Sequence, residues 1–381
     1  MTNSERVLLE LISSSLFGIQ RTYPVNTDWD YVLKEAQAQA VVGVVGYTVP
    51  ERNSGNWTVP KYQILTNYFH ILYIQQQLIE LLTSRGIPLA ILKGTAAAIY
   101  YPIPSQRAMG DIDFIVPRDR YEEAKTTLLK EGYVITHPEE NPPARHIGFQ
   151  KDGVHFELHH HFSYEDLDIE AYIIDGLKHP ETATIDGFSF PMLPKLANGL
   201  VLLAHLRRHL QSGVGLRQVI DWMMYVDKVL DDEFWDSEFR EVAERLNLTT
   251  LAKTATRMCQ MYLGLPTSIT WCSDADTALC ESLMENLLAS GNFGRKKGAG
   301  GIVESVTTTI RREGMFHYLQ RAGEYNWKAY HSHKNLRPFC WLYQIGRYIR
   351  KGVRTRRGTK LLNDMNRGEE RYELLKKLDI V

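Results

Sequence analysis

Two aspartates, Asp111 and Asp113, stand in the segment DIDFIV, and a third acidic residue, Glu157, stands in the segment VHFELHHHF. Residues two apart on an extended strand point to the same side, so the two aspartates are expected to project together. Neighbouring carboxylates repel one another, and a divalent cation relieves that repulsion. Mg²⁺, and Mn²⁺ with similar preferences, bind such oxygen ligands together with substrate phosphates. The pattern therefore predicts a metal site, provided that the strand of Glu157 lies beside that of the aspartates.

A glycine turn precedes the aspartates and has the composition of a phosphate-binding turn. Lys93, Gly94 and Thr95 follow a short apolar segment and open a predicted helix. Backbone N–H groups at a helix start attract phosphate, the Lys93 ammonium adds a point charge, and the Thr95 hydroxyl can donate a hydrogen bond. We expect Arg107 to clamp a phosphate or to brace a carboxylate, and His159 to support the metal site or to contact substrate.

Together these residues predict transfer of a nucleotidyl group from a nucleoside triphosphate such as ATP. Two metal ions about 4 Å apart can activate an attacking hydroxyl and stabilise the pyrophosphate that leaves. We expect Asp111, Asp113 and Glu157 to hold the metal, while the 93–95 turn, Arg107 and His159 bind the triphosphate. Since metals do most of this chemistry, small-molecule, sugar, protein and tRNA acceptors all fit.

The other histidines give weaker metal signals. His159 to His161 have neither a cysteine nor an HExxH frame beside them, so a zinc site there is disfavoured. His205 and His209 have the i,i+4 spacing of helical metal ligands, but their helix is rich in leucine, which favours hydrogen-bonded core histidines. Arg217 and Asp221 share that spacing and are expected to form a helix ion pair.

Two basic segments further along the chain have open interpretations. The loop GNFGRKKGAGG at 291–301 lacks both the GK[ST] ending and the preceding strand of a P-loop, so a surface loop is favoured. Its Arg295, Lys296 and Lys297 could still close over substrate phosphates. The basic segment at 347–360 fits nucleic acid or anionic lipid, but a solvated helical face is the favoured interpretation.

Hydrophobic periodicity predicts the elements that position these residues. The Asp152-Gly153 pair is a strong hairpin signal between two of the predicted strands. Strands are predicted at 87–92, 111–116, 133–136, 147–151 and 154–162. Helices are predicted within the first 85 residues and at 95–101, 120–131, 195–210, 216–230, 232–246 and 249–262.

The expected fold class is α+β, a small mixed sheet with helices, flanked by helical regions on both sides. We expect an N-terminal helical region at 1–86, a core at 87–190 that carries the sheet, and a C-terminal helical region at 191–381.

Composition limits the class of protein. The chain has 381 residues, of which 44% are hydrophobic and 23% charged, as in globular proteins with a buried core. A net charge of -1 excludes a general attraction to nucleic acid, and no apolar run is long enough to predict membrane insertion. The start shows no signal-peptide pattern, and the four cysteines lack CxxC spacing, which favours reduced thiols and a cytoplasmic protein. Oligomeric state is left open.

The segment GIPLAILKGTAAAIYYPIPSQRAMGDIDFIV resembles a family of bacterial nucleotidyltransferases often described as uncharacterised, a branch of the polymerase-β-like superfamily. The resemblance continues through YEEAKTTLLKEGY, VHFELHHHF and HLRRHLQSGVGLRQVIDW, and covers most of residues 25–230. It implies a minimal nucleotidyltransferase core that uses Mg²⁺ and an NTP. The family's metal carboxylates fall on Asp111 and Asp113, and its third acidic position falls on Glu157.

Two positions depart from the wider superfamily. The usual glycine-serine or glycine-glycine pair is Gly94-Thr95 here, and the third acid, more often aspartate, is Glu157. The longer glutamate side chain would shift a second metal, and nucleotide binding survives such changes more easily than transfer does. A non-catalytic nucleotide-binding or scaffold protein is therefore the main alternative to a transferase, and a histidine-based metal hydrolase is a third.

Overall fold

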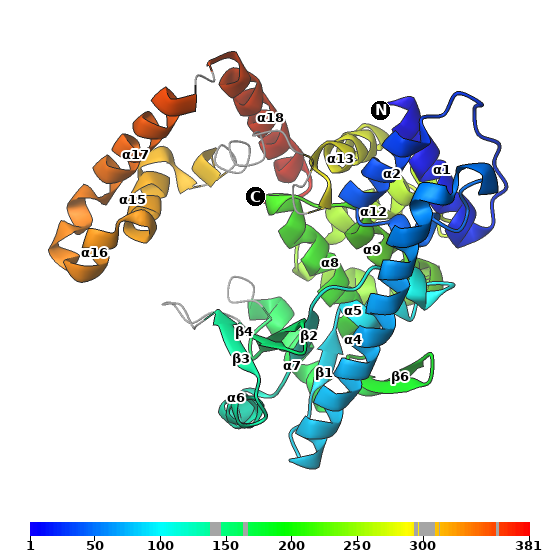
Figure 1. Ribbon diagram of the computed structural model, residues 1–381, viewed down its shortest axis with the longest axis horizontal. Coiled ribbons are helices and arrows are strands. Elements are labelled where there is room, and N and C mark those ends of the chain that lie inside the picture. The colour runs from blue at the N-terminus through cyan, green and yellow to red at the C-terminus, as the bar shows by residue number, and fades with distance from the viewer. Residues whose placement is uncertain (138–145, 163–166, 293–295, 297–308, 312, 356–357) are drawn as a thin grey trace.

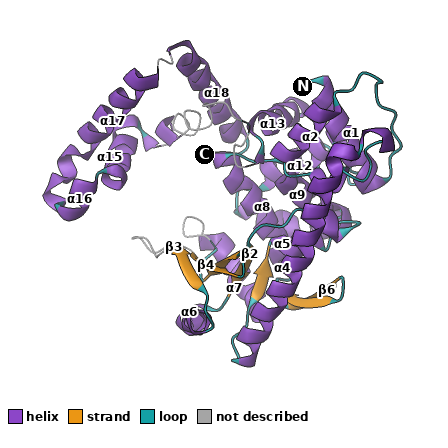
Figure 2. Cartoon of the chain, viewed as in Figure 1, coloured by secondary structure: helices purple, strands orange, loops and turns teal. Residues whose placement is uncertain are grey.

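The protein is described by a computed structural model that covers residues 1–381 except 138–145, 163–166, 293–295, 297–308, 312 and 356–357. A helical part and a sheet part form the main body, and a pair of helices projects away from it (Figure 1). The strands gather in one part of the body, with helices around them (Figure 2). The predicted α+β fold, a mixed sheet flanked by helical regions, is confirmed.

The sheet has seven strands in the order β3-β4-β5-β2-β1-β7-β6. Strand β2 is central: it pairs antiparallel with β1 and parallel with β5, which in turn pairs antiparallel with β4. The strands are β1 (Ala90–Leu92), β2 (Ile112–Ile115), β3 (Val134–His137), β4 (His146–Lys151), β5 (Val154–His159), β6 (Glu181–Ile185) and β7 (Phe188–Met192). In β2, Ile112, Phe114 and Ile115 are at most 2% exposed, so packing in the hydrophobic core fixes the position of this strand.

All five predicted strands are present, but two of them are clearly shorter than predicted: β1 begins at Ala90 instead of Ile87, and β5 ends early. Strand β5 ends at His159, three residues before the predicted end at Phe162, because Phe162 donates its backbone N–H to Glu170 instead of continuing the sheet. The sequence analysis did not predict α7 (Leu167–Lys178) or the β6–β7 hairpin. That hairpin turns at Asp186-Gly187, whose positive φ angles of 46° and 84° fit a two-residue hairpin turn.

The N-terminal helices are α1 (Asn3–Phe17), α2 (Trp29–Ala38), α3 (Val42–Val45) and α4 (Thr58–Ser84). Helix α1 begins at a capping box, in which Thr2 and Glu5 satisfy each other's backbone N–H groups. Helix α4 has 27 residues, runs from the helical part down past the sheet (Figure 1) and contacts β7. It therefore connects the two parts of the body on the side where Asn67 and Gln75 reach the site.

Of the helices beyond the sheet, α8 and α9 pack together and α18 packs on α13. The predicted helix at 232–246 is present as three consecutive helical segments. The principal helices of this region are α8 (Lys195–Ser212), α9 (Leu216–Lys228), α12 (Thr249–Tyr262), α13 (Thr277–Ser290), α15 (Met315–Asn326), α17 (Cys340–Thr355) and α18 (Gly358–Lys377). Helices α15 and α17 form the projecting pair, and α17 carries the first part of the basic segment.

None of the helices in the described part of the chain is both long and apolar enough to cross a bilayer. The four cysteines are buried free thiols.

Candidate active site

The structure brings Asp111, Asp113 and Glu157 together, and we call these three residues the carboxylate cluster. Asp113 lies directly across from Glu157 in the parallel pairing of β2 with β5, so both side chains leave the same face of the sheet. One carboxylate oxygen from each of the three residues lies within 4.8 Å of the others. Asp113 is buried, Glu157 is partly exposed and Asp111, just before the strand, is exposed.

Lys93 is the main counter-charge of the cluster. Its Nζ lies 2.7 Å from Oδ1 of Asp113, and both side chains are buried. Lys93 is the residue after β1, whose last residue, Leu92, pairs with Asp113 across the sheet. Its backbone has φ 51° and ψ -134°, a conformation that costs a residue with a side chain about 1–3 kcal/mol. Strain of this kind is typical of positions that a site holds in place.

The pKa values of the two aspartates are displaced in opposite directions. Desolvation and the charges of Asp113 and Glu157 raise the pKa of Asp111 above its usual value. Burial alone would raise the pKa of Asp113 as well, but Lys93 and His159 outweigh it and hold the pKa well below its usual range. Asp113 is therefore ionised in the folded protein near neutral pH. Asp111, when it is ionised, lacks an equivalent counter-charge.

Two histidines adjoin the cluster. His159 is buried, with Nε2 at 3.1 Å from Oδ1 of Asp113 and 3.4 Å from Oε2 of Glu157. Burial lowers the pKa of His159, but the contacts with the two carboxylates outweigh it, so the net shift is upward. His146, which the sequence analysis did not single out, has Nε2 at 3.5 Å from Oε1 of Glu157. Burial lowers its pKa to about 4, so His146 is neutral near pH 7.

The other histidines that the sequence singled out have different partners. His161 lies beyond the end of the strand, with its Nδ1 3.2 Å from Oε1 of Glu170. His205 and His209 lie on α8 with their Nε2 atoms 2.8 Å apart, which is a hydrogen bond between two histidines. Burial lowers both pKa values, that of His209 to about 4. The pair therefore matches the predicted hydrogen-bonded histidines.

At the glycine turn, Gly94 has φ +36° and begins α5 (Gly94–Ala98). The Thr95 side chain is buried, and its hydroxyl donates a 2.7 Å hydrogen bond to Oε1 of Gln75 on α4. The expectation that this hydroxyl donates to phosphate therefore meets a competing acceptor inside the protein. The predicted helix at 95–101 is shorter, since α5 ends at Ala98.

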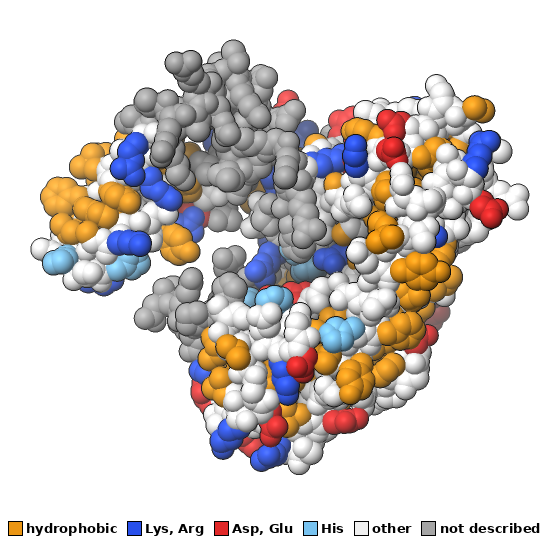
Figure 3. All heavy atoms as spheres, in the orientation of Figure 1, with side chains coloured by type: hydrophobic (Ala, Val, Ile, Leu, Met, Phe, Trp, Pro, Cys, Tyr) orange, Lys and Arg blue, Asp and Glu red, His pale blue; other side chains and the backbone are white. Residues whose placement is uncertain are grey.

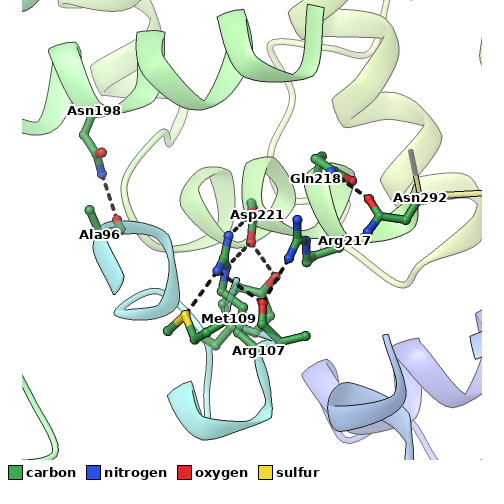
Figure 4. Close-up of polar contacts among 10 residues, drawn as sticks. Ala96, Arg107, Met109, Asn198, Arg217, Gln218, Asp221 and Asn292 are labelled. Carbon is green, nitrogen blue, oxygen red and sulfur yellow. Dashed lines mark hydrogen bonds and ion pairs between the residues drawn. The ribbon is translucent and has the colours of Figure 1, made fainter. Parts of the chain in front are cut away.

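Arg107 braces a carboxylate, the second of the two roles expected for it. Its Nε and Nη2 donate to the two oxygens of Asp221 at 2.7 Å each, and all of these atoms are buried. Tyr101 also donates to Asp221, at 2.7 Å. Asp221 was expected to pair with Arg217 on its own helix, but its close partner is Arg107 from the loop before β2. The Arg107–Asp221 pair thus attaches that loop to α9 (Figure 4).

The loop that carries Asp111 is held from two sides. Arg217 on α9 donates to the Ala108 carbonyl at 3.2 Å, and Asn67 on α4 donates to the Met109 carbonyl at 3.0 Å. Backbone groups are held rather than side chains, so the path of the chain into β2 is fixed. The sequence offered no signal for these contacts, because they join segments far apart in the chain.

A cavity of about 610 Å³ opens beside the cluster. Asp111 and Glu157 line it, together with Asn67, Arg217 and Asn292 from the helical part. Figure 3 shows basic, acidic and histidine side chains gathered where the helical part of the body meets the sheet part. A volume of this size lies within the roughly 300–1,000 Å³ of small-molecule sites.

The loop at 291–301 is described only in part. Lys296 is paired with Glu35 at 2.6 Å and Glu5 at 3.2 Å, so it ties the N-terminal helices to this loop. Lys296 is therefore paired with those carboxylates, which disfavours the alternative that it closes over substrate phosphates. Arg295 and Lys297 lie outside the described residues, as do the side chains of the basic segment from 351 onward.

Comparison with known proteins shows the family to which the chain belongs. No curated protein matches the chain. Among solved structures, it is similar to the crystal structure of an antigenic nucleotidyltransferase-like protein from Paracoccidioides brasiliensis. The identity is 15% and the TM-score 0.34, and the match covers 52% of this chain and 95% of that chain. Residues 26–264 match the family described as uncharacterised nucleotidyltransferase, and the chain belongs to that family.

Proposed function

We propose that this chain is a Mg²⁺-dependent nucleotidyltransferase that moves a nucleoside monophosphate from an NTP to a hydroxyl-bearing acceptor. The acceptor oxygen bonds to the α-phosphorus as the bond to pyrophosphate breaks, and the hydroxyl proton is released. The observation that carries the proposal is the convergence of Asp111, Asp113 and Glu157 at the wall of a 610 Å³ cavity. We further propose a cytoplasmic location, and descent from the polymerase-β-like superfamily on the residue pattern described above.

The donor set of the cluster fits Mg²⁺. Three carboxylates supply hard oxygen ligands within 4.8 Å of one another, and Mg²⁺ binds through few carboxylates while keeping positions for phosphate. Only part of the negative charge is balanced from within, by Lys93 and His159 on Asp113. When bound, Mg²⁺ or Mn²⁺ would supply charge stabilisation for the α-phosphate and the leaving pyrophosphate.

The protein's own residues have distinct proposed roles around that site. Asp111 and Glu157 would face the metal from the cavity wall, and Asp113 would complete the set from the buried side. Lys93 would hold Asp113 in one orientation through its 2.7 Å contact, rather than reach the triphosphate. The backbone at Gly94 and Thr95 is the proposed binding position for phosphate, and Arg217 on the cavity wall is an additional candidate.

One observation favours the second candidate, a nucleotide-binding protein without transfer activity. Oδ1 of Asp113 already accepts from both Lys93 and His159, so the buried ligand is partly neutralised without a metal. A protein that had lost transfer could keep such an internal counter-charge and still bind nucleotide through Asp111 and the cavity. Binding without turnover distinguishes this candidate from the transferase.

The test combines binding with turnover. Calorimetry with each of the common NTPs, with Mg²⁺ and with EDTA, is expected to show Mg²⁺-dependent binding. Incubation with α-labelled NTP and separate metabolite, protein and RNA fractions is then expected to give a labelled acceptor and released pyrophosphate. Binding with no labelled product in any fraction favours the second candidate, and an absence of Mg²⁺-dependent binding contradicts both.

A further inference from the structure

A second group of potential metal ligands lies on the same sheet face as the carboxylate cluster. In the antiparallel pairing of β4 with β5, His146 stands opposite His159, and Gly148 stands opposite Glu157. Glu157 and His159 are two residues apart on one strand, so their side chains leave the same face as His146. Gly148 adds no side chain over Glu157 and lines the cavity together with His146 and Glu157, whereas His159 is buried.

The distances within this group differ from those of hydrogen bonds. Nε2 of His146 is 3.5 Å from Oε1 of Glu157, and Nε2 of His159 is 3.4 Å from Oε2. An N–H···O hydrogen bond normally measures about 2.7–3.2 Å. Two ligands that share a tetrahedral metal at about 2.0–2.1 Å lie about 3.3–3.5 Å apart. Each histidine nitrogen stands at about the second separation from a different oxygen of Glu157, and one ligand atom from each of the three residues falls within 4.8 Å of the others.

We propose that His146, Glu157 and His159 form a binding site for a first-row transition-metal ion, of which Zn²⁺ and Co²⁺ are the best fits. The ion would replace the proton that His159 Nε2 directs toward Asp113. Two imidazole nitrogens and a carboxylate suit such ions, whereas Mg²⁺ prefers oxygen alone. His146 and Glu157 line the cavity, so a water or a substrate oxygen entering from there would complete the coordination. The site does not depend on nucleotidyl transfer, although Glu157 belongs to both ligand groups.

The neighbouring histidines make the choice of ligands specific. His161 is taken by Glu170, and the His160 ring packs on Tyr121 with the ring centroids 4.1 Å apart. His155 is on the same strand as Glu157 and His159 but is exposed and lies outside the group. His155→Ala is therefore a matched control for His146→Ala, since both remove one histidine from the same pair of strands.

Co²⁺ is the probe, because its visible absorption reports on nitrogen ligation. The full chain, stripped with chelator, is titrated with Co²⁺ and followed by absorption and equilibrium dialysis. Wild type and His155→Ala are expected to show the same absorption bands and affinity. His146→Ala is expected to lose the bands and to bind Co²⁺ more than about 100-fold more weakly, beyond the roughly 10–100-fold that loss of a residue supporting a ligand causes.

Two further variants separate this site from the carboxylate cluster and from misfolding. Asp111→Asn changes the carboxylate cluster only, so it should retain Co²⁺ absorption even if it loses Mg²⁺-dependent NTP binding. His146→Gln keeps a polar side chain of similar size and should lose Co²⁺ while unfolding at the wild-type temperature in EDTA. The proposal is overturned if wild type shows no Co²⁺ bands, if His146→Ala keeps them, or if Asp111→Asn loses them.

Discussion

Asp113 and Asp221 are both buried aspartates that are paired with a basic side chain, and they lie on either side of the boundary between the sheet and the helices. Asp221 accepts hydrogen bonds from Arg107 through both oxygens and from Tyr101, all at 2.7 Å. Asp113 accepts from Lys93 and His159 through one oxygen, while two more carboxylates approach to ligand distance.

The difference lies in the balance of charge. Around Asp221, one carboxylate meets one guanidinium in bidentate geometry, and charge and hydrogen bonds are satisfied within the fold. Around Asp113, three carboxylates share Lys93 and a histidine, and two of the carboxylates border a cavity. Burial and a salt bridge therefore do not identify a functional site by themselves. An excess of negative charge beside a cavity does identify one, because a ligand can reach the unbalanced carboxylates.

The largest predicted effect belongs to Asp221. Asp221→Asn leaves the Arg107 guanidinium buried without its counter-ion, and breaking a buried pair in this way costs about 3–5 kcal/mol. Urea unfolding should show that loss in the free energy of unfolding, equally with and without Mg²⁺. A double variant, Arg107→Met with Asp221→Leu, removes both charges and should recover much of the loss. If the loss of unfolding free energy in Asp221→Asn depends strongly on Mg²⁺, the proposed difference between the two aspartates is contradicted.

Lys93→Met makes the corresponding change at the carboxylate cluster. It should also destabilise the fold by about 3–5 kcal/mol, since Asp113 loses its closest counter-charge. Here, however, Mg²⁺ should restore part of the stability, about 2.7 kcal/mol at a concentration 100 times the dissociation constant. Thermal unfolding across a Mg²⁺ series measures the difference. If Mg²⁺ stabilises Lys93→Met no more than it stabilises wild type, a bound cation does not take over the role of Lys93 beside Asp113.

Thr95→Val should have a smaller effect, on stability alone. The valine leaves the buried Gln75 side chain without its 2.7 Å donor, at a cost of about 1–3 kcal/mol, whereas Thr95→Ser keeps the hydroxyl. NTP affinity of Thr95→Val should stay within about twofold of wild type, because the hydroxyl faces Gln75 and not the cavity. A large loss of affinity with normal stability would instead assign the Thr95 hydroxyl to phosphate.

The smallest effect is a pH dependence at Asp111. Its pKa is higher in the folded protein than the ordinary value of 3.8, so the ionised side chain destabilises the fold. Well below that value the group is protonated in both states and contributes nothing, and the destabilisation develops as pH rises through the folded pKa. Asp111→Asn should therefore match wild type near about pH 4 or below and exceed it in stability at pH 7 in EDTA. A pH-independent difference in unfolding free energy would contradict this assignment.

The sequence predicted most of the sheet face and little of what surrounds it. Alternation along DIDFIV and VHFELHHHF was enough to predict which residues within each strand share a face, because a period of two is a local property. That Asp113 meets Glu157 depends on the pairing of β2 with β5, which was a condition of the prediction. The β6–β7 hairpin carried the same Asp-Gly signal, at Asp186-Gly187, as the turn at Asp152-Gly153, and was still missed. Its β7 strand includes Pro191, which weakens a strand pattern.

Long-range pairing explains the remaining differences. Arg107 and Asp221 are 114 residues apart, and no local pattern distinguishes a phosphate clamp from an internal brace. His146 joins the site through the register of β4 against β5, which a sequence without pairing information does not supply. The hydrogen bond from Thr95 to Gln75 likewise depends on long-range packing, because it requires α4 to lie against the glycine turn. The predicted boundaries at 86/87 and 190/191 stay predictions.

The most direct test of the carboxylate cluster is calorimetric titration of Mg²⁺ with NTP into wild type, Asp111→Asn and Asp119→Asn. Asp119 is an exposed aspartate outside the cluster and serves as the matched control. We predict that wild type and Asp119→Asn bind NTP with the same Mg²⁺-dependent affinity, and that Asp111→Asn loses this dependence while its unfolding remains cooperative. Unchanged Mg²⁺-dependent affinity in Asp111→Asn would contradict the account.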